Sequence, residues 1–62
     1  MDKLLLRPVE VAHAIGIGRS KVYELLASGE LPSIRIGGVV RVPVEQLRAW
    51  IEGQALRTQP SR

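Results

Sequence analysis

The sequence predicts a small α+β domain, mostly helical, with three helices and a two-stranded β-hairpin, over residues 1–53. Apolar residues recur at helical spacing in residues 8–28 and 43–53, and an alternating stretch around two glycines fills residues 33–42. A chain of 62 residues is one domain. It can bury only about 60% of its unfolded surface. With no Phe, one Trp and one Tyr, aliphatic side chains must form the core.

The composition excludes several classes of function. The chain has no Cys, which excludes a disulfide framework, a thiolate zinc site and cysteine catalysis. An isolated His13 cannot make a metal site alone, and no catalytic constellation is apparent, so we expect neither a cofactor nor an enzyme. The net charge of +3 favours a polyanionic partner. No apolar run suits a membrane helix or a signal peptide, so we expect a cytoplasmic protein of bacterial type.

Residues 8–28 carry the pattern of two short helices that cross tightly. Ala12 is small where the second helix would land, and Gly16 can adopt the positive φ that ends the first helix. Ile17 would fill the corner, and Val22 begins the inner stripe of the second helix. This is the helix-turn-helix arrangement, in which the second helix is presented to the DNA major groove.

The ends of these two helices can be predicted from capping residues. The first helix is expected over residues 8–15, with proline at its first position and Arg7, a poor capping residue, at the N-cap. The second is expected over about residues 19–28, with Gly29 just past its end. Residues 4–6 are expected to be extended, as an edge strand.

The hairpin of residues 33–42 turns at Gly37 and Gly38. A two-residue loop would place Arg41 on the same face as Ile34. A three-residue loop places all four apolar strand residues on one face, so packing favours it. The pairs in this register are Ile36 with Val40 and Ile34 with Val42.

The preferred register would set Arg35 and Arg41 opposite each other on the outward face. Like charges directly across strands repel. A phosphate between them would relieve the repulsion, so we predict that they form a phosphate or minor-groove clamp. Gly37 and Gly38 are required by the turn and could also let the backbone approach DNA closely. Val39 could be a wedge at a base step or only a turn residue, and both interpretations stay open.

A third helix is expected from Pro43 to near Gly53. Residues 54–62, which include Arg57 and Arg62, are expected to form a basic, disordered tail. Trp50 is assigned to the core rather than to a stacking platform. The inner stripe of this helix would comprise Val44, Leu47 and Ile51, flanked by Trp50.

Seven short motifs follow one another in a set order. They are Val9-Glu10-Val11-Ala12, Ile15-Gly16-Ile17, Arg19-Ser20-Lys21-Val22-Tyr23, Ser28-Gly29-Glu30-Leu31-Pro32, Arg35-Ile36-Gly37-Gly38, Arg41-Val42-Pro43 and Leu47-x-x-Trp50. Together they resemble the excisionase-type DNA-binding domain, a small winged helix related to the MerR family, over about residues 4–52. The resemblance implies a recognition helix in the major groove and a wing at the adjacent minor groove or backbone. It implies either an excisionase, which biases an integrase towards excision without catalysis, or a small transcriptional regulator. It also implies a nucleoid-associated protein encoded by a bacterium, phage or plasmid.

Three positions depart from the family pattern. Gly18 stands where a capping Ser is common, Glu24 where many relatives are basic, and the Val39-Val40 wing tip lacks the usual basic residue. The long dimerisation helix of larger MerR proteins is also missing from the chain, so we expect a monomer in free solution. Several copies would then bind head-to-tail on repeated sites in double-stranded DNA.

The first turn of the second helix carries Arg19, Ser20 and Lys21. In this motif such residues reach base edges, where Arg or Lys can bond guanine O6 and N7. Positive charge at a helix N-terminus opposes the macrodipole, so folding does not explain Arg19 and Lys21. We therefore predict that these three residues are the leading DNA contacts.

Three further residues could also contact DNA. Tyr23 could reach a phosphate through its hydroxyl or pack at the helix junction. Glu24 could accept a hydrogen bond from a cytosine amino group, but we favour a surface role in which it orients Arg19 or Lys21. Arg7 could contact the DNA backbone. The third class of function is a protein-interaction module, in which none of the predicted residues would contact DNA.

Overall fold

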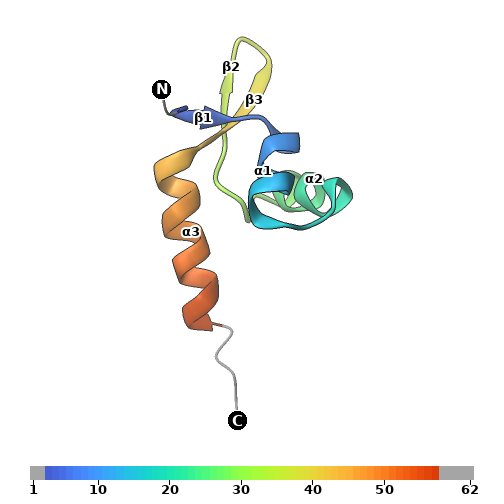
Figure 1. Ribbon diagram of the computed structural model, residues 1–62. Helices are drawn as coiled ribbons and strands as arrows, with labels where there is room; N and C mark the ends of the chain where they lie inside the picture. Colours follow the sequence, from blue (N-terminus) through green and yellow to red (C-terminus); the bar gives the residue numbers. More distant parts are fainter. Residues whose placement is uncertain (1–2, 58–62) are drawn as a thin grey trace.

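The computed structural model describes residues 3–57, which form three helices and a three-stranded antiparallel sheet (Figure 1). This architecture confirms the predicted fold class, a winged helix-turn-helix. Between residues 3 and 57, no helix combines the length and apolar character needed to cross a membrane. The elements in chain order are β1 (Leu5–Leu6), α1 (Pro8–Ile15), α2 (Arg19–Ser28), β2 (Ile34–Ile36), β3 (Val39–Pro43) and α3 (Val44–Arg57).

The predicted ends of α1 and α2 are confirmed, and glycines make both C-terminal caps. Gly16 has a φ of 74°, and its N–H donates to the Ala12 carbonyl at 2.9 Å. Gly29 has a φ of 82° beyond the last residue of α2. A residue with a Cβ is strained at such angles, so these glycines set where each helix stops.

The N-terminus of α1 is capped by Glu10 rather than by Arg7. A guanidinium has no acceptor atom, so the Arg7 side chain cannot receive a backbone N–H. Instead, Glu10 Oε1 accepts the Arg7 backbone N–H at 2.8 Å. This is one half of a capping box, and it explains how a poor capping residue is tolerated at this position.

The core lies between the helix pair and the sheet. Trp50 packs against it, as predicted, whereas Ile51 is 40% exposed and the expectation that it faces inward is wrong. Leu31 is only 1% exposed, although the sequence indicated no more than an extended exit there. The buried residues are Val11, Ala12, Val22, Leu31, Val42 and Leu47.

The predicted three-residue hairpin loop is wrong. The strands pair Ile34 with Arg41, Arg35 with Val40, and Ile36 with Val39, which leaves a two-residue turn. Gly37 and Gly38 have φ values of 55° and 85°, and two successive positive φ angles form the I′ turn whose twist matches that of the strands. The packing argument failed because the turn, not the burial of every apolar side chain, sets the register.

The sheet order is β1-β3-β2, so β1 is the predicted edge strand. Helix α3 begins at Val44, one residue later than predicted, and runs past Gly53 to Arg57. A glycine inside a helix costs only about 1 kcal/mol relative to alanine, so it need not end the helix. Residues 54–57 of the expected tail are therefore helical, and residues 58–62 lie outside the described part of the chain.

Candidate nucleic-acid interface

Helix α2 presents five of the predicted contact residues to solvent. Val22 is fully buried and fixes the helix against α1 and the core, which turns the opposite side outward. The exposed residues on the outer and flanking sides of α2 are Arg19, Ser20, Lys21, Tyr23 and Glu24. Their placement confirms the predicted orientation of this helix. Their contact with DNA remains a prediction.

The first turn of α2 is basic and carries no acidic residue. Gly18 occupies the N-cap and has no side chain that could accept hydrogen bonds from the free N–H groups of the helix. The partial positive charge of the helix end therefore adds to that of Arg19 and Lys21. This combination favours the binding of a phosphate or an electronegative base edge at the start of α2.

Glu24 pairs with Lys21 one turn earlier on α2. Lys21 Nζ lies 3.4 Å from Glu24 Oε1, and both side chains are well exposed, at 63% and 70%. Such an exposed pair contributes little to stability. In the free protein it keeps the Lys21 ammonium beside a carboxylate, so Glu24 would compete with DNA for this charge. The role of orienting Lys21 on DNA stays a prediction.

Helix α2 and the hairpin form the two walls of one hollow of about 250 Å³. Tyr23 and Ala27 line it from α2, and Arg35 and Val40 line it from the hairpin. Arg35 reaches this space because it pairs with Val40 on the face of the hairpin that turns towards α2. The structure thus brings together Tyr23 and Arg35, whose neighbourhood the sequence did not indicate.

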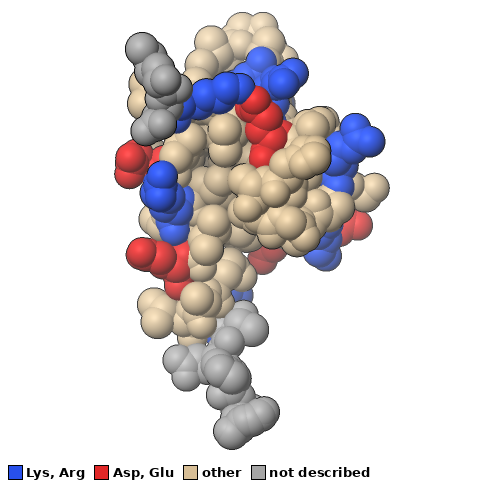
Figure 2. Space-filling model, viewed as in Figure 1, with Lys and Arg blue, Asp and Glu red and all other residues tan. Residues whose placement is uncertain are grey.

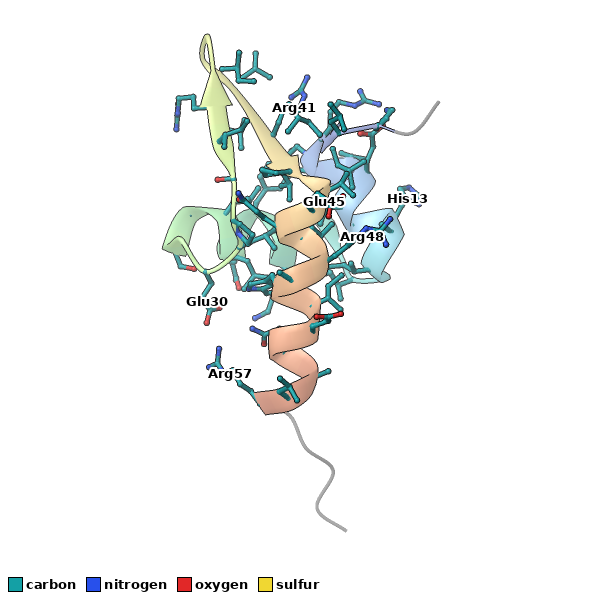
Figure 3. The ribbon with its side chains drawn as sticks, turned by 90° about the vertical axis from the view of Figure 1, so that its left-hand side faces the viewer. His13, Glu30, Arg41, Glu45, Arg48 and Arg57 are labelled. Carbon is teal, nitrogen blue, oxygen red and sulfur yellow. The ribbon has the colours of Figure 1, made fainter. Side chains whose placement is uncertain are left out.

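The predicted placement of Arg35 and Arg41 directly across the strands is wrong, because they lie on opposite faces of the hairpin. Their role as phosphate or minor-groove contacts stays a prediction. Arg41 is half-buried on the outer face, and its Nη1 donates to the Val40 carbonyl at 2.8 Å. Figure 3 shows it along β3 above α3. The two arginines therefore face different surroundings, Arg35 the hollow beside α2 and Arg41 the outer face of the hairpin.

Arg7 belongs to a small ionic cluster at the junction of β1 and α1. Glu10 Oε2 binds Lys3 Nζ and lies 3.7 Å from Arg7 Nη2. Hydrogen bonds from Lys3 and from the Arg7 backbone lower the pKa of Glu10 to about 2, from an ordinary 4.5. Figure 2 shows basic side chains gathered there around one acidic group. The pairs of β1 with β3, continued by one residue, would set Arg7 opposite Arg41.

His13 is exposed on α1, and Figure 3 shows it away from the hairpin tip. Across residues 3–57, no three His, Cys, Asp or Glu side chains come together as a metal site would require.

The fold and the exposed basic helix define a helix-turn-helix DNA-binding domain. Residues 5–55 match the family model described as a helix-turn-helix domain, and the chain belongs to this family. Within it, the domain is of the excisionase type, as its similarity to two curated proteins shows. No solved structure is significantly similar to the chain.

The two relatives differ in how much of their length this chain spans. A "Probable excisionase" of Saccharopolyspora erythraea is 48% identical over 42 residues, which are 68% of this chain and 43% of that protein. An "Excisionase" of Streptomyces ambofaciens is 44% identical over 50 residues, which are 81% of each chain. This chain therefore spans less than half of the first relative and most of the second.

Proposed function

We propose that the protein binds double-stranded DNA in a sequence-specific manner, without catalysis, and directs an integrase towards excision. The observation that carries this proposal is the exposed basic first turn of α2, joined to the hairpin through one concave surface. Helix α2 would lie in the major groove, and the hairpin would reach the adjacent minor groove or backbone. The names of the two relatives supply the excisionase role.

The contact residues divide between base edges and phosphates. Arg19, Ser20 and Lys21 would meet base edges, and a good bidentate contact discriminates by about 1–3 kcal/mol. Tyr23 and Arg35 line the same hollow, so both could hold one stretch of backbone. The backbone contacts would be completed by Arg7, Arg41 and the N–H groups of Gly37 and Gly38.

One copy should bind modestly. A single module of this size buries only about 600–1,000 Å² of protein surface on DNA. Several monomers placed side by side on repeated sites would supply useful affinity. An integrase that recombines the same DNA would be the protein partner.

A recombination assay tests the excisionase role. The protein is added to the cognate integrase and a substrate that carries both attachment sites of the integrated element. We expect excision to depend on the wild-type protein, to be lost with Arg19→Ala and Lys21→Ala, and to survive Arg57→Ala at the far end of α3. Excision that proceeds equally without the protein would contradict this role. Binding sites at promoters would then identify a transcriptional regulator with the same contacts.

A further inference from the structure

The tip of the hairpin is slender and apolar. Ile36 and Val39 pair across the strands beside the turn, and they are 54% and 44% exposed. Between them lie Gly37 and Gly38, which have no side chains and open space around them. This tip projects beyond the helices (Figure 1). It therefore consists of two branched apolar side chains over a bare backbone turn.

Folding does not account for this exposure. Val40 and Val42 already supply the inward face of β3, and Val42 is fully buried. Ile36 and Val39 point to the opposite face, where polar residues would serve the fold equally well. An exposed apolar edge strand is moreover an aggregation liability that proteins usually avoid. Exposed apolar side chains that the fold does not need indicate contact with a partner.

The two arginines behind the tip indicate what that partner is. Arg35 lies on one face of the hairpin and Arg41 on the other. The minor groove of B-DNA is about 6 Å wide and is bordered on each side by the phosphates of one strand. A hairpin that enters it tip first would carry one arginine towards each border. The apolar pair, which shares the outer face with Arg41, would meet the bases beside that border.

We propose that Ile36 and Val39 form an apolar wedge that enters the minor groove, partly unstacks one base step and bends the duplex. This inference rests on the proposed DNA-binding function and deepens it, because it names the step that deforms the DNA. Apolar wedges of Ile, Leu or Met in the minor groove kink DNA by about 20–90° towards the major groove. Such a bend would bring distant integrase sites together.

The hairpin itself offers matched variants. The double substitution of Ile36→Thr with Val39→Thr keeps the β-branched shape and removes the apolar surface at the tip. Ile34→Thr is the control, because Ile34 lies on the same outer face, is 38% exposed, and sits at the other end of β2. Val39→Leu is a second control, because it keeps the tip apolar and changes only its shape. Circular dichroism confirms that each variant is folded.

The bend is measured by fluorescence resonance energy transfer between the ends of a short duplex that carries one footprinted site. With wild-type protein we expect a bend of tens of degrees. The double Thr variant should lose about half of this bend or more and bind several-fold more weakly. The dependence of its affinity on salt should not change, because no charge is removed. Ile34→Thr and Val39→Leu should bend DNA like the wild type.

The alternative outcomes distinguish a failure of the wedge proposal from a failure of the DNA-binding proposal. Wild-type protein that binds no duplex would overturn both. Wild-type bending that persists in the double Thr variant would overturn the wedge and leave the DNA-binding proposal intact. A third outcome is that Ile34→Thr and the double Thr variant weaken binding to tandem sites equally, while both bend a single site like the wild type. The outer face of the hairpin would then join neighbouring copies, and the wedge would be wrong.

Discussion

Arg35 and Arg41 lie on opposite faces of the hairpin, because Arg35 pairs with Val40 and Arg41 with Ile34. Arg35 faces α2 across the hollow that Tyr23 also lines, whereas Arg41 donates to the Val40 carbonyl on the outer face. The two side chains therefore cannot close on one phosphate as a pair. We expect them to contact two phosphates independently.

Independent action predicts additive losses. Arg35→Ala and Arg41→Ala should each lower the slope of log K against log salt by about 0.9, and the double variant should lower it by about 1.8. Titrations at several salt concentrations measure these slopes. A double variant no different from either single variant would show that both arginines share one phosphate.

The Lys21–Glu24 pair predicts that Glu24 restrains binding. Glu24→Gln removes a negative charge from the exposed face of α2 and frees Lys21, so DNA affinity should rise several-fold at low salt, with a steeper salt dependence. Glu30→Gln is the matched control, because it removes the same charge beyond the C-terminal end of α2. A loss of affinity confined to sites with one particular cytosine would instead show that Glu24 reads a base.

The lowered pKa of Glu10 predicts that the stability of the fold depends on pH in the acid range. Its pKa is lowered to about 2 by Lys3 and by the Arg7 N–H, so its contribution is fully present above about pH 4.5 and is lost as the pH falls towards 2. Glu10→Gln should therefore lower the thermal midpoint at pH 6, and this difference should shrink at pH 2.5. Glu52→Gln, which removes a carboxylate outside the ion pairs found in residues 3–57, should show no such convergence. A constant difference at both pH values would contradict the role of Glu10.

The buried position of Leu31 predicts a large loss of stability on truncation. Leu31→Ala should cost about 2–5 kcal/mol, since Leu31 is 1% exposed and is one of the largest core side chains. Leu56→Ala is the same substitution at a residue that is 72% exposed, and it should cost well under 1 kcal/mol. Urea unfolding measures both. Equal losses would contradict the assignment of Leu31 to the core.

The parts of the fold that depend on local signals could be predicted from the sequence. Gly16 and Gly29 fix the ends of α1 and α2 because positive φ angles favour glycine, and Val22 shows which side of α2 is buried. Since burial on one side determines exposure on the other, the basic face of α2 was predictable as well. Its use in DNA binding rests on the chemistry of those side chains.

The parts that depend on competing signals could not be predicted in the same way. At the hairpin, the Gly37-Gly38 turn and the burial of Ile34 and Ile36 demanded different registers, and the turn prevailed. The three-residue loop would turn Ile36 inward, so it does not predict an exposed apolar tip. Gly53 is typical of a helix end, but a glycine inside a helix costs only about 1 kcal/mol, which is too little to end α3. Leu31 was missed because a lone apolar residue before a proline carries no periodic pattern.

The central claim is that the first turn of α2 reads DNA sequence. The most direct test is a selection from random and host-derived duplexes at moderate salt, performed with the wild-type protein and with Arg19→Ala. The account predicts that the wild type enriches a short motif in tandem copies and that Arg19→Ala loses the preference at one or two positions of that motif. A folded wild-type protein that enriches no motif would contradict the claim and leave a protein-interaction module as the better account.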